Sequence, residues 1–227
     1  MPLFYHELST PEIRRVAASG VLLVIPWGSI EQHCNAPSGL DYLISMKLSI
    51  RACELLENKG EGRCVIAPPV PYGFSPEWSR IGGTISVSLE TMKGLISDIL
   101  GSAVNAGFRK IAIINAHGGN SGLLQAVTRE WLSKRPGLIV SVVDYWREAG
   151  INLGHADKIE ETIAKYLGVL DPNFSIDCDN IGSMDLLRIT SGPERETGIQ
   201  GYISGDFDPK RLIESIYQYL KKLATVT

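Results

Sequence analysis

The sequence has no long hydrophobic run and no excess of basic charge. None of its 227 residues falls in an apolar stretch of 18 residues, the length that a membrane-spanning helix needs. Lys and Arg number 22 against 25 Asp and Glu, and no five like charges are consecutive. Nucleic-acid-binding proteins concentrate basic charge on one face or stripe. We therefore expect neither a membrane nor a nucleic-acid partner.

Cysteine is also scarce, and the first residues lack the features of a secretion signal. Cys34, Cys53, Cys64 and Cys178 form no CxxC pair and are too few for a disulfide framework in a chain of this length. No basic flank followed by an apolar segment begins the chain. We expect a cytoplasmic protein with unpaired cysteines, in which Cys34 is a small buried apolar side chain rather than a metal ligand.

Two common catalytic motifs are missing. The sequence contains no GxSxG turn, which would present an activated serine, and no GxGxxG turn, which would bind a dinucleotide. The segment GTISV at 83–87 has no phosphate-loop pattern either. A function must therefore depend on the polar residues that the chain does concentrate.

Short apolar runs alternate with longer helical patterns. The runs typical of strands are 21–26, 64–70, 110–116 and 138–146, and the helical patterns are 41–60, 88–107, 121–134, 155–168 and 208–224. Such alternation indicates βαβ units. We predict one α/β domain over 1–227, with three α/β/α layers and a mainly parallel central sheet. Residues 168–206 show little periodicity and are expected to be irregular structure over one end of the sheet.

Polar clusters follow two of the predicted strands. Glu31 and His33 come shortly after the run at 21–26, and His117 directly follows the run at 110–116. In open α/β sheets, ligands bind beyond the carboxyl ends of the strands. The two clusters are therefore expected to meet at one crevice, although 84 residues separate the two histidines.

Each of these residues also has a local explanation. Glu31 and His33 could belong to a polar loop, Asp41 could cap the next helix, and His117 could sit in a turn that Asn120 or Ser121 caps. The fifth and sixth candidates are His155, a possible helix cap, and Glu160, a possible solvated acid. Taken together, three histidines and three acids at strand ends and helix starts are the ligands of a divalent-metal centre.

The order of these motifs resembles the creatininase (creatinine amidohydrolase) family. GSIEQH, the later Asp41, PYGFSPEW followed by GGTISV, NAHGGN and GHADKIEE match that family's GSxEQHGPHLPxxTD, YGxSxEHxxFPGTISL, NGHGGN and HAGExETS. The match runs from about 20 to 165, and GDFDP at 205–209 is similar to a weaker motif. The resemblance implies a metal-dependent hydrolase of amide, lactam, formamide or peptide-like C–N bonds, with a parallel-sheet α/β fold and commonly a hexamer.

The resemblance also assigns roles residue by residue. It implies two divalent ions per subunit, Zn, Mn or Fe, which activate a water, with Asp41 bridging them. The implied ligands are Glu31, His33, Asp41, His117 and Glu160. The candidate proton donors are His155 and Glu77. Trp78, Tyr72 and Trp146 are candidates for the pocket of a small-molecule substrate, although core packing would also explain these aromatic residues.

Departures from the family pattern leave alternatives open. The segment between His33 and Asp41 is one residue shorter than in the family, and Ala36 replaces a histidine. Gly119 stands where creatininase itself has a glutamate ligand, so creatinine is not the expected substrate. A lapsed family member that binds metal or a small ligand without turnover is one alternative. A binding domain without metal, whose polar turns are only caps, is another.

Overall fold

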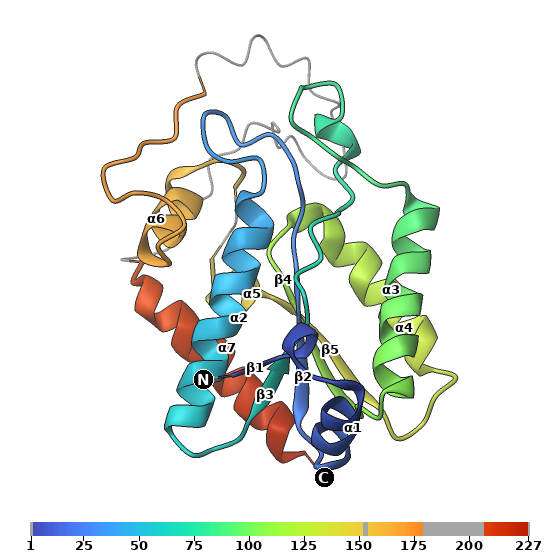
Figure 1. The fold of residues 1–227 in the computed structure, drawn as a ribbon. Helices are drawn as coiled ribbons and strands as arrows, with labels where there is room; N and C mark the ends of the chain where they lie inside the picture. The colour runs from blue at the N-terminus through green and yellow to red at the C-terminus, as the bar shows by residue number, and fades with distance from the viewer. Residues whose placement is uncertain (1, 152–153, 179–206, 227) are drawn as a thin grey trace.

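A five-stranded, fully parallel sheet forms the centre of the molecule (Figure 1). The computed structural model describes residues 2–151, 154–178 and 207–226. The strand order is β1-β3-β2-β4-β5. The strands are β1 Leu3–Phe4, β2 Leu22–Trp27, β3 Cys64–Ile66, β4 Lys110–Asn115 and β5 Ile139–Asp144. The predicted α/β class and mainly parallel sheet are confirmed.

Helices cover both faces of this sheet, so that the molecule has three layers (Figure 1). Successive residues of β2 alternate between two apolar cores: Leu22 and Val24 pack in one, and Leu23 and Ile25 in the other. The first core holds α2 Leu40–Asn58, α5 Tyr145–Glu148, α6 Lys158–Tyr166 and α7 Pro209–Thr225, and the second holds α1 Thr10–Ala18, α3 Leu89–Asn105 and α4 Ser121–Leu132. None of the helices in the described ranges has both the length and the hydropathy that crossing a bilayer takes.

Two elements at the start of the chain were not predicted from the sequence. Strand β1 extends the sheet edge next to β3, and helix α1 follows it. The start of α1 carries a recognisable signal, because Ser9 and Glu12 form a capping box and Pro11 lies in the first turn. Strand β3 is shorter than predicted because Pro68 and Pro69 follow it closely, and proline cannot donate a sheet hydrogen bond.

The carboxyl ends of three strands lie at one level. Trp27, Asn115 and Asp144 are neighbours in register across β2, β4 and β5, and each is the last residue of its strand. The Asn115 side chain donates a hydrogen bond of 2.8 Å to Asp144 Oδ1 at this edge. The loops that follow the three strands therefore leave the sheet side by side.

The expectation of four unpaired cysteines is wrong. Cys34 and Cys178 form a disulfide across 144 positions of sequence, whereas Cys53 and Cys64 are buried and free. Cys34 is only partly buried, in a turn, and is not the apolar core side chain that we expected. The predicted irregular segment 168–206 is described only up to residue 178, and its remainder lies outside the described residues.

Candidate metal centre

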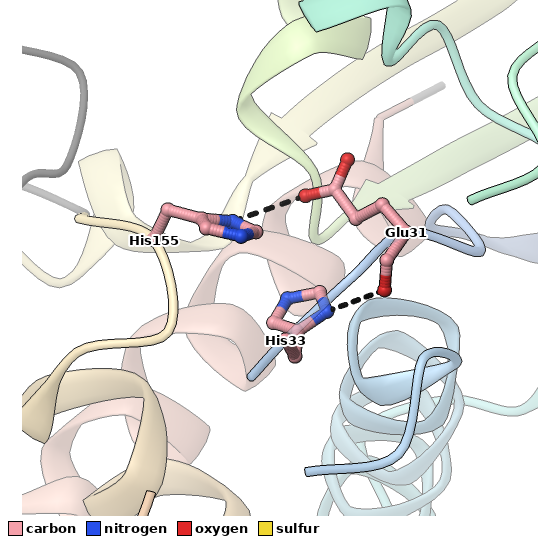
Figure 2. Close-up of side chains that lie close together, drawn as sticks. All are labelled: Glu31, His33 and His155. Atoms are coloured by element: carbon pink, nitrogen blue, oxygen red, sulfur yellow. Dashed lines mark hydrogen bonds and ion pairs between the residues drawn. The ribbon is translucent and has the colours of Figure 1, made fainter. Parts of the chain in front are cut away.

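Six side chains gather at the carboxyl edge of the sheet in three overlapping triads. Within each triad, one ligand atom per residue lies within 4.8 Å of the others. The triads are Glu31–Asp41–His117, His33–Asp41–Glu160 and Glu31–His33–His155. Figure 2 shows the third, with Glu31 and the two imidazoles facing a common centre. The structure thus brings together the five predicted ligands and His155. The outermost of them, Glu31 and Glu160, are 129 residues apart in sequence.

Separate elements deliver these side chains. Glu31 and His33 lie in the loop after β2, His117 lies two residues after the end of β4, and Asp41 lies in the first turn of α2. His155 precedes α6, and Glu160 lies in the first turn of that helix. Asp41 and His155 are not helix caps, since the N-cap residues of α2 and α6 are Gly39 and Asp157. All the metal-ligand candidates are buried, with exposed fractions between 1% and 5%.

The backbone fixes the protonation pattern of His33. Its Nδ1 lies 3.0 Å from the Glu31 carbonyl oxygen, which can only accept a hydrogen bond, so Nδ1 carries the proton. The other nitrogen, Nε2, lies 3.2 Å from Asp41 Oδ1 and 3.8 Å from Glu160 Oε2. Two carboxylates therefore face the ring nitrogen that is available to bind a cation.

His117 shows the same arrangement with its nitrogens exchanged. Its Nε2 lies 3.1 Å from both the Phe74 carbonyl oxygen and the Ser75 hydroxyl. Nδ1 then faces Asp41 Oδ2 at 3.1 Å and Glu31 Oε1 at 3.3 Å. Each of the two oxygens of Asp41 thus faces a different imidazole, which is the geometry of a shared ligand.

The electrostatics of the cluster favour bound positive charge. Burial opposes a charge on His33, but Asp41, Glu160 and Glu31 outweigh it and raise the pKa of His33 from 6.5 to about 10. Burial likewise opposes ionisation of Asp41, yet His33 and His117 lower its pKa from 3.8 to about 2. For Glu160, burial dominates and raises the pKa from 4.5 to about 8. Without a metal ion, protons on the imidazoles supply the positive charge.

The residues present fit divalent metal ions. Glu31 Oε2 and His33 Nε2 are buried and have no hydrogen-bond partner among the described residues, which costs about 1–3 kcal/mol per group unless a ligand pairs with it. Imidazole nitrogens and carboxylate oxygens are the donor set of Zn, Mn and Fe. Two of the triads share Asp41, so this carboxylate could offer an oxygen to a metal ion in each of them.

The shortened segment after His33 does not pull Asp41 out of the cluster. A tight turn absorbs the missing residue, with the Ala36 N–H donating to the His33 carbonyl at 2.9 Å. Ser29, which the sequence analysis did not select, donates a hydrogen bond of 2.8 Å to Asp41 Oδ2. Ser29 therefore fixes the carboxylate that the two triads share.

His155 is the most exposed of the six side chains, with 16% of its side chain accessible. Its Nδ1 lies 3.2 Å from Glu31 Oε1, the contact drawn in Figure 2, and its ring stacks on Trp78 at a centroid distance of 4.1 Å. Gln32, another residue that we did not select, lies 2.9 Å from His155 Nε2. Trp78 is thus the one predicted pocket aromatic that contacts the cluster.

The other three predicted site residues lie elsewhere. Glu77 is half-buried in the short helix η2 Pro76–Trp78, and the described residues give it no hydrogen bond or ion pair to the cluster. Tyr72 is 45% exposed and lines an apolar cavity of about 450 Å³ beside α3, on the other core. Trp146 packs in the core beneath α2 and α7. The structure does not bring these three together with the metal ligands.

Asn120 holds the loops around His117. Its side chain donates to the Gly28 carbonyl at 2.9 Å and accepts from the Phe74 N–H at 3.0 Å. It occupies the N-cap position of α4 but makes no side-chain cap hydrogen bond there. The NAHGGN motif drew attention to Asn120, but only as a possible helix cap. Its role in joining loops that are far apart in sequence could not be predicted from that local pattern.

Gly119 cannot be replaced by a side-chain-bearing residue without a rearrangement. A Cβ atom there would lie 2.5 Å from His117 Nε2 and closer still to the Phe74 carbonyl oxygen. The glutamate that creatininase carries at this place therefore does not fit the present backbone. Glu160, from the opposite side of the cluster, supplies a carboxylate beside His33 instead.

We expect Gly119→Ala to lower the free energy of unfolding by about 1–3 kcal/mol, the usual cost of overpacking. It should also reduce metal binding, because the added methyl group displaces the His117 ring. Gly118→Ala is the matched control, since a Cβ there meets nothing within 4 Å. Urea unfolding and metal analysis of the two variants test this, and equal behaviour would contradict it.

Comparisons with known proteins identify the family and the fold. The family model described as "Creatininase: Creatinine amidohydrolase" matches residues 6–168. Among solved structures, "Crystal structure of creatinine amidohydrolase (creatininase)" superposes with a TM-score of 0.70 at 19% identity, over 97% of this chain and 96% of that one. "Creatininase Mn" gives 0.70 at 18% identity, over 98% and 97%. At these identities the structural matches show a common fold.

Relatives of assigned activity match about half of this chain. A 3-dehydro-scyllo-inosose hydrolase of Thermotoga maritima is 30% identical over 119 residues, 51% of this chain and 36% of that protein. A mycofactocin precursor peptide peptidase of Mycolicibacterium smegmatis is 29% identical over 124 residues, 54% and 50% respectively. A creatinine amidohydrolase of Pseudomonas putida is 28% identical over 126 residues, 52% and 46%. The matched part thus spans half or less of these relatives' own length.

Proposed function

This chain belongs to the creatininase family, and we propose that it is a metal-dependent hydrolase of an amide, lactam or formamide C–N bond in a small molecule. The observation that carries the proposal is the pair of buried triads that share Asp41, with imidazole nitrogens facing carboxylates. The metals named for its structural neighbours, "Creatininase Mn" and a mutant creatininase of "Zn-Zn type", support a divalent transition metal here.

Creatinine itself is not the proposed substrate. The three relatives are named for an inosose, a precursor peptide and creatinine, so this family scaffold serves different substrates. In this chain Gly119 stands where creatininase has its glutamate ligand, and Trp78 stacks on His155 at the rim of the cluster.

Bound divalent ions would supply Lewis acidity and an activated water for attack on a carbonyl carbon. The protein's own contribution is to hold the ligands rigidly. The carbonyl groups of Glu31 and Phe74 fix the ring orientations of His33 and His117, and Ser29 fixes Asp41. Such outer hydrogen bonds keep ligating atoms in place before an ion binds.

His155 is the proposed proton donor to the leaving nitrogen. It is the most accessible imidazole of the cluster and lies against Glu31. Gln32 orients it, and the direction of that amide is determined. Because Gln32 Oε1 accepts from the Cys34 N–H at 3.1 Å, its Nε2 must donate to His155 Nε2 at 2.9 Å. The His155 proton then lies on Nδ1 in this arrangement.

Gln32→Leu should lower kcat by about 10–100-fold, the usual effect of losing an outer hydrogen bond at such a site, while both metal ions remain bound. The leucine keeps the packing but cannot hold the His155 ring. Steady-state kinetics together with metal analysis provide the measurement.

A double-mutant cycle with His155→Ala supplies the control for Gln32→Leu. If Gln32 acts through His155, adding Gln32→Leu to His155→Ala should lower kcat little further. Additive losses in the double variant would show that Gln32 acts through some other contact.

The proposed activity is tested by a substrate screen. Formamides, lactams and short peptides are offered to Zn-, Mn- and Fe-loaded protein, with chelator-treated protein as the control. Hydrolysis that requires metal supports the proposal. The alternative of a lapsed, non-catalytic member depended on displacement of Asp41, yet Asp41 lies 3.2 Å from His33. Absence of turnover on every substrate despite two bound ions would favour that alternative.

By family resemblance we also propose a homo-oligomer, with a hexamer as the specific expectation. Light scattering of the purified protein measures the mass directly. A mass equal to the 24.8 kDa of one chain would reject it.

A further inference from the structure

The segment 175–178, here called the strap, is attached to the turn that carries His33. Cys178 is bonded to Cys34 through the disulfide. Asn35 adds two hydrogen bonds: its side-chain amide donates to the Ser175 carbonyl at 3.0 Å and accepts from the Asp177 N–H at 2.8 Å. One covalent bond and two hydrogen bonds thus hold the strap to the residues that directly follow His33.

The strap is also attached to the helix that carries Glu160. The Ile176 N–H donates a hydrogen bond of 2.9 Å to Glu161 Oε2, next to Glu160 in sequence. The other oxygen of this carboxylate, Oε1, pairs with Lys158 Nζ at 2.5 Å and with Lys165 Nζ at 2.7 Å. The charged carboxylate is therefore a firm anchor for the strap at the start of α6.

These attachments bridge the two elements that deliver His33 and Glu160. Those side chains approach each other at 3.8 Å between Nε2 and Oε2, and both belong to one triad. The triad Glu31–Asp41–His117 has a separate brace, because Asn120 in the loop after β4 bonds to Gly28 in the loop after β2 and to Phe74. The two proposed ion sites are thus supported by different parts of the chain.

We propose that the strap is a positioning element for one metal ion, the ion held by His33, Asp41 and Glu160, and that the Cys34–Cys178 disulfide makes this role sensitive to redox state. This inference rests on the proposed metal centre and adds that one of its two ions is controlled separately. Cys178 is exposed, so a reductant can reach the disulfide.

The redox step is a two-electron exchange with a dithiol. The S–S bond between Cys34 and Cys178 breaks, each sulfur gains one electron and one proton, and the dithiol closes to its own disulfide. Reduction removes the covalent link between the strap and the turn that carries His33, and the two hydrogen bonds to Asn35 that remain across this junction are exposed and of modest net strength. The turn that carries His33 and the start of α6 are then held less tightly relative to each other.

The test uses the whole chain, stripped of metal and titrated with Mn²⁺ in a calorimeter. Oxidised wild type is compared with wild type that was reduced by dithiothreitol and desalted under nitrogen, and with Cys34→Ser/Cys178→Ser. We expect two Mn²⁺ per oxidised chain. In the reduced protein and in the double variant, one ion should keep its affinity and the other should bind about 10–100-fold more weakly.

Two controls keep the outcome interpretable. Dithiothreitol should cause no further change in Cys34→Ser/Cys178→Ser, which shows that its effect passes through this disulfide. Asn35→Ala keeps the covalent bond but loses both amide contacts, and should weaken the same ion by a smaller factor. If the cysteine variant does not fold, the reduced wild type and Asn35→Ala still carry the test.

Thiol counting gives a readout that does not involve metal. Denatured, unreduced wild type should show two reactive thiols, from Cys53 and Cys64, and reduced protein should show four. Four thiols without reduction would overturn the inference, as would equal weakening of both ions or no change in either. Failure of oxidised wild type to bind any Mn²⁺, Zn²⁺ or Fe²⁺ would overturn the proposed function together with it.

Discussion

Asp41→Asn should remove both metal ions and lower the rate of hydrolysis by about 10³-fold or more, the scale on which loss of an essential member of a catalytic unit acts. Asp41 is the one residue common to the two proposed ion sites, and its two oxygens face His33 Nε2 and His117 Nδ1. The amide keeps the size of the side chain but removes the charge and turns an N–H₂ group toward one of these nitrogens.

Elemental analysis after metal reconstitution and steady-state kinetics on the best substrate measure this effect. Asp98→Asn is the matched control, because Asp98 is exposed on α3 and far from the cluster in sequence and in its contacts. It should retain two ions and full activity. An Asp41→Asn protein that also retains both would contradict the assignment of a shared ligand.

The metal-free protein should be most stable near pH 4–5 and should lose unfolding free energy up to pH 10, by on the order of 5 kcal/mol for each of the two groups whose pKa folding raises, since one pKa unit is worth about 1.36 kcal/mol. Folding raises the pKa of His33 from 6.5 to about 10, so its contribution is complete below pH 6.5 and is lost as the pH rises through 10. Folding raises the pKa of Glu160 from 4.5 to about 8, so stability also falls between these values.

At acidic pH, the free energy of unfolding changes in the opposite direction and falls as the pH is lowered. Folding lowers the pKa of Asp41 from 3.8 to about 2, so its contribution is complete above pH 3.8 and is lost as the pH falls toward 2. Bound metal ions replace the protons on the histidines, and their affinity grows as protons become scarce. Metal-loaded protein should therefore keep its stability between pH 5 and 9.

Urea unfolding from pH 3 to 10, with chelator and with metal, measures both profiles. Glu160→Gln is an informative variant, because the neutral amide cannot ionise. In the metal-free protein it should reduce the loss of unfolding free energy between pH 4.5 and 8. A metal-free protein whose stability does not change between pH 5 and 9 would contradict the charge arrangement described here.

The strand-end residues could be predicted from sequence because parallel strands place their carboxyl ends at one edge. Glu31, His33 and His117 needed only that rule, and the register of Trp27 with Asn115 places their loops side by side. The assignment of Asp41 and Glu160 needed the family resemblance, since each had a sufficient local explanation as a cap or a solvated acid.

Other features depend on contacts that no local pattern encodes. The Cys34–Cys178 disulfide joins positions 144 apart, and the direction of the Gln32 amide follows from one backbone N–H in a turn. Tyr72 lines the apolar cavity beside α3 rather than the cluster, because the chain after β3 runs along that cavity. Nothing in the local sequence distinguishes Tyr72, which lines that cavity, from Trp78, which stacks on His155 in the cluster.

Anomalous diffraction from crystals of manganese- or zinc-reconstituted protein tests the central claim most directly. We predict two peaks per chain, one within coordination distance of Glu31, Asp41 and His117, and one within coordination distance of His33, Asp41 and Glu160. No peak at the carboxyl edge of the sheet, or peaks that do not share Asp41, would contradict a two-ion centre built on this carboxylate.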